Sequence, residues 1–185
     1  MLEDRIKWNK KHQQGNEPSD ASSIVAQFFG LASGNKALDI AAGNGRNSIF
    51  LAEHGFVVDA IDISEAGLAR FAGRRSNINP ICADLDIFDI PPDRYDLIVN
   101  IKFLSRRLFP YIYEGLTDGG ILIFETFIEA PDEKIKQPNS RDYLLRENEL
   151  LHAFLRLKII YYREGRGPDK SADTCLASLV AIKRR

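Results

Sequence analysis

Three aspartates stand within or just after apolar runs in the first half of the chain, and each is suited to bind a polar ligand group. Asp39 lies inside the run "ALDIA", where a buried carboxylate needs a cationic or hydrogen-bonding partner. Asp62 ends the next run, about 20 residues further on, the spacing at which a carboxylate accepts hydrogen bonds from both hydroxyls of a ribose. Asp84 follows the third run and would accept from the exocyclic amine of a purine, with Ile63 and Leu85 as apolar cover for the ring.

The loop that follows Asp39, "AAGNG", is short of side chains. Gly43 and Gly45 permit backbone angles closed to other residues and let a ligand touch the main chain, although a tight strand-to-helix turn would use the same glycines. Dinucleotide loops place phosphate at a helix start, where a neighbouring acid is unfavourable. Asp39 therefore favours a ligand with an ammonium or sulfonium group, and the loop and acids together predict an adenosine with a cationic amino-acid tail.

The elements that must position these residues alternate along the chain. Apolar runs typical of strands occur at 36–41, 56–63, 78–85, 95–101 and 121–127, and helical patterns at 46–55, 64–76 and 106–116. This alternation predicts a parallel sheet covered by helices on both faces. A turn is expected at 117–120.

Two further apolar runs, 155–165 and 174–183, follow a short helical pattern at 147–154. The segment between the two runs is too short for a parallel crossover, so they must form an antiparallel hairpin. The sequence therefore predicts an α/β fold: a doubly wound, mostly parallel, seven-stranded Rossmann-like sheet with a C-terminal antiparallel hairpin and helices on both faces.

We expect a single domain over residues 1–185. It would consist of an N-terminal helical cap (1–34), a cofactor-binding half (36–127), a candidate lid (128–146), and a helix with the terminal hairpin (147–185).

Composition limits the partners. The net charge of −1 over 185 residues provides no basic field for nucleic acid or anionic lipid, and the pairs Arg74-Arg75 and Arg106-Arg107 are interpreted as solvated. Cys82 and Cys175 lie in apolar runs and are expected to be buried and reduced. No apolar run approaches the ~18–20 residues of a membrane span, and the histidines lack metal-ligand spacing. We expect a cytoplasmic protein, a monomer or weak homodimer, without metal or membrane partners.

The motifs now assembled resemble those of the class I S-adenosylmethionine-dependent methyltransferases. "LDIAAGNGR" is similar to their first motif, "DAIDIS" to the segment with the ribose-binding acid, and "CADL" to the adenine-contacting segment. Within the class, "GNGRNSIFLAEHGFVVDAIDIS" is similar to the small bacterial tellurite-resistance-like methyltransferases. The family pattern has glycine where this chain has Ala41 and a small residue where it has Arg46, a change that the tellurite-resistance-like group shares.

The resemblance implies S-adenosyl-L-methionine as the cofactor and methyl transfer by in-line displacement. Positioning and exclusion of water supply much of the rate, and an already anionic acceptor needs no base. We therefore name no catalytic residue. The residues and the resemblance together assign the cofactor contacts to Asp39, Ala41, Gly43, Asn44, Gly45, Arg46, Asp62, Ile63, Ala83, Asp84, Leu85 and Asn100.

The acceptor is expected to be a small molecule enclosed between the strand ends, the candidate lid and the N-terminal helix, whose apolar anchors would be Ile6 and Trp8. The candidate acceptor-binding residues are Trp8, Lys102, Glu125, Arg141 and Tyr143.

Three alternatives remain open. The segment Asn100-x-x-Phe103, "NIKF", is similar to the motif with which amino-directed methyltransferases orient a nitrogen of nucleic acid or protein. If it is not such a motif, Asn100 is a strand-end neighbour of the cofactor and Phe103 begins a packed helix. An NAD(P)-dependent oxidoreductase would also use a glycine loop and a ribose-binding acid, but Asp39, Ser48 and the antiparallel ending disfavour it. A non-catalytic cofactor-binding module would share the fold.

Overall fold

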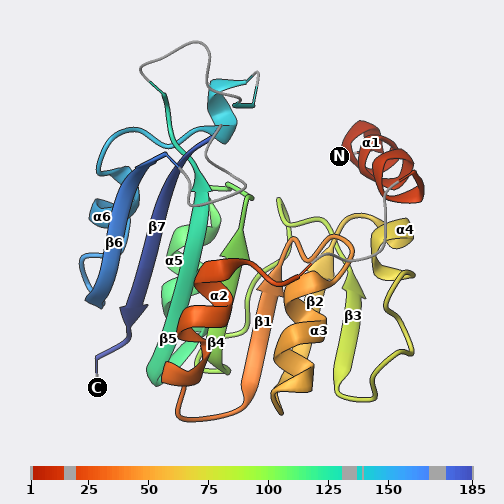
Figure 1. Ribbon diagram of the computed structural model, residues 1–185, viewed down its shortest axis with the longest axis horizontal. Coiled ribbons are helices and arrows are strands. Elements are labelled where there is room, and N and C mark those ends of the chain that lie inside the picture. Colours follow the sequence, from red (N-terminus) through yellow and green to blue (C-terminus); the bar gives the residue numbers. More distant parts are fainter. Residues whose placement is uncertain (1, 15–19, 131–136, 139, 167–173, 185) are drawn as a thin grey trace.

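The computed structural model describes residues 2–14, 20–130, 137–138, 140–166 and 174–184. Its centre is a seven-stranded sheet in the order β3-β2-β1-β4-β5-β7-β6 (Figure 1). Neighbouring strands pair in parallel from β3 to β5, whereas β7 is antiparallel to both β5 and β6. The strands are β1 (Lys36–Ile40), β2 (Val57–Asp62), β3 (Ile78–Cys82), β4 (Tyr95–Ile101), β5 (Leu116–Phe127), β6 (Lys158–Arg166) and β7 (Cys175–Ile182). The predicted sheet and its terminal hairpin are confirmed.

Helices cover both faces of this sheet, as the sequence predicts. The α-helices are α1 (Leu2–Gln13), α2 (Ser23–Phe28), α3 (Arg46–Glu53), α4 (Glu65–Leu68), α5 (Leu108–Gly115) and α6 (Glu149–Ala153). Apolar residues of α2, α3 and α4 pack on one face, and those of α5 and α6 on the other. No helix in the described ranges is both long enough and apolar enough to cross a membrane.

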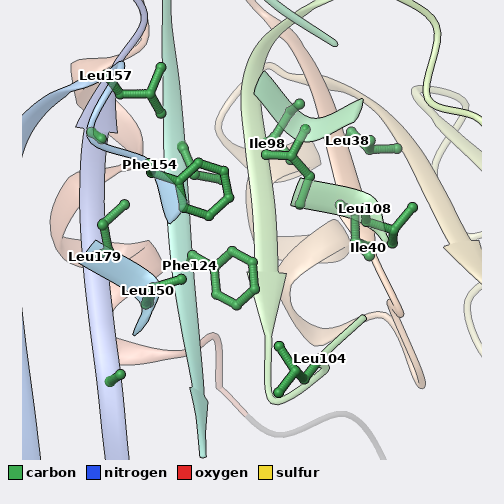
Figure 2. Packing of buried hydrophobic residues seen from close by; sticks show 14 of the residues in the cluster. Leu38, Ile40, Ile98, Leu104, Leu108, Phe124, Leu150, Phe154, Leu157 and Leu179 are labelled. Atoms are coloured by element: carbon green, nitrogen blue, oxygen red, sulfur yellow. The ribbon is translucent and has the colours of Figure 1, made fainter. Parts of the chain in front are cut away.

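The alternation of side chains along each strand divides the core into two layers. Leu38 and Ile40 of β1 join Phe124 of β5 in the layer under α5 and α6 (Figure 2). In that layer the rings of Phe124 and Phe154 have centroids 5.9 Å apart. The intervening residues, such as Ala37, contribute to the opposite layer. Because both faces are buried, the strand registers are fixed, and with them the positions of the strand ends.

The helix expected over 64–76 is wrong beyond its first turn. Helix α4 ends at Leu68, and Gly73 has a φ of +74°. Glycines are poor helix formers, so the second half of the segment turns instead. The buried ring of Phe71 lies against the main chain of Gly45, where an added Cβ would be 2.3 Å from Phe71 Cδ1. The turn after α4 therefore packs the ring of Phe71 against the glycine loop at Gly45.

Two other local expectations are wrong. The turn expected at 117–120 is part of β5, where the register with β4 shifts between Tyr95 and Leu97. Phe103 does not begin a helix, because α5 starts only at Leu108.

Two predicted burials also fail. Cys82 is exposed at the end of the edge strand β3, while Cys175 is buried. Ile6 is 60% exposed, and none of the residues of α1 is buried. Ile6 therefore does not anchor α1, while Trp8 is half-buried, and the helix lies above the end of the sheet near α4 (Figure 1).

Candidate functional site

The carboxyl ends of the central parallel strands lie side by side at one edge of the sheet. Ile40 of β1 pairs with Ile61 of β2 and with Asn100 of β4, and Ile101 pairs with Glu125 of β5. Helix α1 and the chain after β5 both lie at this edge (Figure 1). Ligands of open α/β sheets bind at this edge, and the glycine loop and the predicted residues at the strand ends lie here.

The glycine loop follows β1 in a left-handed backbone conformation. Ala41, Gly43 and Gly45 have φ values of +54°, +58° and +82°. A Cβ atom is strained at each of these angles, which explains the two glycines and means that Ala41 carries this strain. An added Cβ at Gly43 would lie 3.3 Å from Cε1 of His12, so α1 approaches the loop closely.

Asp39 is fully enclosed just before this loop. It is 1% exposed, and the buried hydroxyl of Ser48 in α3 donates to its Oδ2 over 2.6 Å. Burial raises the pKa of Asp39 to about 7, against the opposing effects of the Ser48 hydrogen bond and the Arg46 guanidinium, while the carboxylate of Asp62 raises it further. A cation placed beside Asp39 would favour its charged form.

Asp62 is held in a fixed orientation at the end of β2. Gly43 N–H donates to its Oδ2 and Ser64 N–H to its Oδ1, each over 2.8 Å. A carboxylate offers about four lone-pair sites, so each oxygen keeps one site for a further donor. Two vicinal hydroxyls of a ribose match this arrangement.

Asp59 lies three residues before Asp62 on the same strand, so its side chain faces the opposite side of the sheet. The donors to its carboxylate are Lys36 Nζ, Asn79 Nδ2, Arg94 Nη2 and the hydroxyl of Tyr95. These contacts lower the pKa of Asp59 despite its burial. Asp59 is therefore a structural ion-pair centre.

The end of β3 supplies the third acid. Asp84 is half-buried, and its Oδ1 accepts from Asp86 N–H over 2.9 Å. The preceding Ala83 N–H donates to the carbonyl of Asp62, which ties the ends of β2 and β3 together. Leu85 is buried and Ile63 half-buried. The arrangement leaves carboxylate oxygen and apolar surface beside the ribose acid, as an adenine would require.

The ends of β4 and β5 carry the acceptor candidates. The amide of Asn100 is buried and donates to the carbonyl of Phe103 over 2.8 Å. Lys102 has a φ of +58°, and its N–H donates to the carbonyl of Glu125 over 2.7 Å. The buried carboxylate of Glu125 accepts from the hydroxyl of Ser178 over 2.8 Å. Desolvation, and then the Arg46 guanidinium, lower the pKa of Lys102.

The candidate lid is described only at its ends, because 131–136 and 139 lie outside the described residues. Ile128 forms a bridge with Leu145, so the two ends of the segment are tied together. Arg141 has a side chain that is 89% exposed and lies 4.0 Å from Glu129, and Tyr143 is 45% exposed. The structure does not bring these two side chains into contact with the glycine loop.

The two arginines after β4 are structural, contrary to the solvated interpretation. Arg106 forms an ion pair with Glu149 and donates to the carbonyls of Asp142 and Leu144. Arg107 pairs with Asp89. Both arginines thus connect the end of β4 to neighbouring loops.

Three residues of α1 and α3 that contact the glycine loop or its neighbouring strand ends were not identified from the sequence. His12 covers Gly43, Asn9 Oδ1 accepts from Ser64 Oγ and from Ala66 N–H, and Ser48 holds Asp39. The role of Ser48 could have been predicted, because the buried Asp39 needs a hydrogen-bond donor and Ser48 is in the first turn of the next helix. The roles of His12 and Asn9 could not, since their partners lie more than thirty residues away in the sequence, on other elements. Within the described residues, no group of histidine, cysteine or acidic side chains has the arrangement of a metal site.

Comparison with known proteins agrees with this geometry. Residues 37–120 match the family model of the methyltransferase domain. TehB of Haemophilus influenzae, a probable S-adenosyl-L-methionine-dependent methyltransferase, is 27% identical over 159 residues, with 80% of this chain and 52% of that protein covered. The ubiquinone biosynthesis O-methyltransferase of Coxiella burnetii is 30% identical over 102 residues, with 50% of this chain and 44% of that protein covered. The chain spans about half of the length of these curated relatives.

Solved structures show the same fold. The crystal structure of TehB from Haemophilus influenzae superposes with a TM-score of 0.71 at 22% identity, covering 97% of this chain and 67% of that one. The 1,6-didemethyltoxoflavin-N1-methyltransferase of Burkholderia thailandensis, solved with 1,6-didemethyltoxoflavin and S-adenosylhomocysteine, superposes with a TM-score of 0.74 at 16% identity, covering 99% of this chain and 87% of that one. Residues 37–120 thus match the methyltransferase domain, and the chain as a whole is similar to TehB and shares its fold with methyltransferases of known structure.

Proposed function

We propose that this protein transfers the methyl group of S-adenosylmethionine to a small-molecule acceptor. The observation that carries the proposal is the geometry of Asp62, whose two oxygens are each fixed by a backbone N–H and each keep an acceptor site. A ribose fits this carboxylate, and a cationic amino-acid tail fits the buried Asp39 at the other end of the glycine loop.

The roles of the chain's own residues follow from these positions. Bound S-adenosylmethionine would supply an activated methyl group on a sulfonium. Asp62 would orient the ribose, Asp84 would accept from the adenine amine, and the loop at Gly43 would let the cofactor lie against the main chain. Helix α1, with His12 above Gly43, would exclude water from the loop.

A small acceptor is favoured by several features together. The net charge is −1, and the arginine pair after β4 is engaged in internal contacts. The named acceptor of the toxoflavin methyltransferase, a fold relative, is a small molecule. We infer that the acceptor lies beside the ends of β4 and β5, near Lys102 and Glu125, under α1 with Trp8 and the segment with Arg141 and Tyr143.

Calorimetric titration with S-adenosylmethionine and S-adenosylhomocysteine tests the cofactor site. Asp62→Ala should weaken binding of both by ~1.5–3 kcal/mol, or about tenfold to a hundredfold, because charge-assisted hydrogen bonds to the ribose are lost. Asp59→Asn is the matched control, since this acid lies on the same strand but faces the opposite side. It should retain the affinity while losing stability. Comparable small effects of the two substitutions would contradict the assignment of Asp62.

Methyl transfer itself is tested with labelled S-adenosylmethionine and a panel of thiols, amines, carboxylates and bulk RNA. We expect label in a small molecule. Cofactor binding without transfer to any member would favour a non-catalytic module, and label in RNA would favour the nucleic-acid alternative.

A further inference from the structure

Two cations, Lys102 and Arg46, stand at the acceptor side of the sheet edge without a close ion pair to any acid of the described residues. Lys102 directly follows β4, and Arg46 begins α3 directly after the glycine loop. Because Ile40 and Asn100 are paired across β1 and β4, the two cations lie at the same edge of adjacent strands. Neither forms an ion pair with any residue of the described ranges.

Both cations occupy unfavourable positions. Lys102 has a φ of +58°, a left-handed conformation that strains any residue with a side chain. It is held there by the hydrogen bond from its N–H to the carbonyl of Glu125. Arg46 is in the first turn of α3, where the positive end of the helix dipole disfavours a cation. Strained positions of this kind persist chiefly where a site requires them.

The charges around Lys102 are mostly of its own sign. Arg46 and Lys11 of α1 act to lower its pKa, and only Glu125 opposes them. The Glu125 carboxylate is buried and already accepts from Ser178. Lys11 also lies 4.3 Å above the ring centroid of Trp8, which places an indole beside this group of cations.

We propose that Lys102 binds an anionic methyl acceptor, a small thiolate or carboxylate whose charged atom lies at the end of β4, with Arg46 adding positive charge from the cofactor side. This inference rests on the proposed function. The lone pair of the anion forms the new bond to the methyl carbon, while the carbon–sulfur bond of the cofactor breaks and its electron pair stays on sulfur. A neutral methylated product and a neutral thioether result. No proton is released, so the reaction needs no general base.

The test is binding of probe anions to the protein saturated with S-adenosylhomocysteine. Mercaptoacetate and benzoate are each compared with the uncharged amides mercaptoacetamide and benzamide, at constant ionic strength. Trp8 is the sole tryptophan of the chain, so its fluorescence reports binding beside Lys11, and calorimetry gives the affinity. At least one anion should bind about tenfold or more tightly than its amide, the effect of a charge-assisted contact.

Two variants remove the cation of Lys102. Lys102→Gln and Lys102→Gly should both abolish the preference for the anion, and the glycine variant should fold at least as well because it suits the left-handed angle. Affinity for S-adenosylhomocysteine should change less than twofold. The exposed Lys158 at the start of β6 gives the charge-matched control, Lys158→Gln, which should bind like the unmodified protein.

Three results would overturn the inference, and they are distinguishable. A tenfold loss of S-adenosylhomocysteine binding in both Lys102 variants would mean that the cation holds the carboxylate of the cofactor. Absence of any anion preference in the loaded protein would contradict the acceptor site while leaving the cofactor site intact. Failure of the unmodified protein to bind S-adenosylhomocysteine at all would refute the proposed function itself.

Discussion

The buried pair of Asp39 and Ser48 gives the protein a pH dependence that is measurable without a ligand. The pKa of Asp39 is raised from 3.8 to about 7. Since the folded state then holds this proton more tightly than the unfolded chain, the associated stability is complete below about pH 4 and is lost as the pH rises to about 7. Asp39 alone should lower the free energy of unfolding by about 1.4 kcal/mol per pH unit within that window.

Urea unfolding at several pH values between 4 and 8 measures this slope. Asp39→Asn can still accept from Ser48 but has no proton to lose, so its stability should fall less with pH than that of the unmodified protein. The difference between the two curves isolates Asp39 from the other titrating groups, including Asp59 and His12, which both proteins contain. Parallel curves would show that Asp39 is charged throughout.

Ala41 is a residue at which the loop departs from the family pattern, which has glycine there. Its φ angle predicts how the Ala41→Gly substitution changes the free energy of unfolding. Its φ of +54° strains a side chain. Ala41→Gly should therefore raise the free energy of unfolding by ~0.5–1 kcal/mol, the relief of strain less the added freedom of the unfolded chain. Ala42→Gly is the control, because Ala42 is buried in the core without a positive φ and the same change there should destabilise. Denaturant titration of both variants measures these changes, and a loss of stability in Ala41→Gly would contradict the expectation.

At the scale of single residues, the sequence was enough to place a side chain whose position depends only on where its strand ends. Asp39, Asp62 and Asp84 could be placed at one edge because apolar runs locate the ends of strands. The contact between His12 and Gly43 could not, since it depends on where a surface helix docks, and no apolar pattern specifies that. The exposure of Cys82 was also missed, because an edge strand has the same apolar composition as a central one.

Helix α1 is attached to the rest of the molecule almost entirely by polar contacts. Asn9 accepts from Ser64 and Ala66, Arg5 pairs with Glu65, and the carbonyl of His12 accepts from Arg70. Surface contacts of this kind are individually weak. We therefore expect α1 to detach at a free-energy cost well below that of global unfolding, while the sheet remains folded.

Asn9→Ala tests this expectation. It removes the acceptor of two hydrogen bonds, so limited proteolysis within α1 should become faster while the midpoint of thermal unfolding changes little. Deleting residues 1–15 should impair methyl transfer far more than folding. S-adenosylhomocysteine should slow proteolysis of α1 in the unmodified protein. A large loss of thermal stability on deletion would mean that α1 is an integral part of the fold.

Elements were predicted well where burial dictates them and poorly where it does not. The strands are confirmed because each is apolar and bounded by polar turns. Helix α4 was overestimated, since the apolar residues of 64–76 suggested a longer amphipathic helix, whereas Phe71 packs under Gly45 from a turn.

At the scale of the whole molecule, the net charge argues against nucleic acid as a partner. A net charge of −1 provides little counterion release on binding nucleic acid. Fluorescence anisotropy with a labelled RNA at low salt should show no binding at low micromolar protein. Salt-sensitive binding at that concentration, reduced by replacing Arg74 and Arg75 with glutamine, would contradict the small-acceptor proposal.

The position of β7 has a consequence for how the chain is made. β7 is synthesised after β6, yet it lies between β5 and β6 and pairs with both. Until β7 emerges from the ribosome, the apolar strand β5 ends the nascent sheet with an unpaired edge, and such edges recruit other chains. Slow translation of the stretch before β7 would prolong that interval. Chaperone demand in the cell should therefore depend on how soon β7 follows β6 in synthesis rather than on the stability of the folded protein.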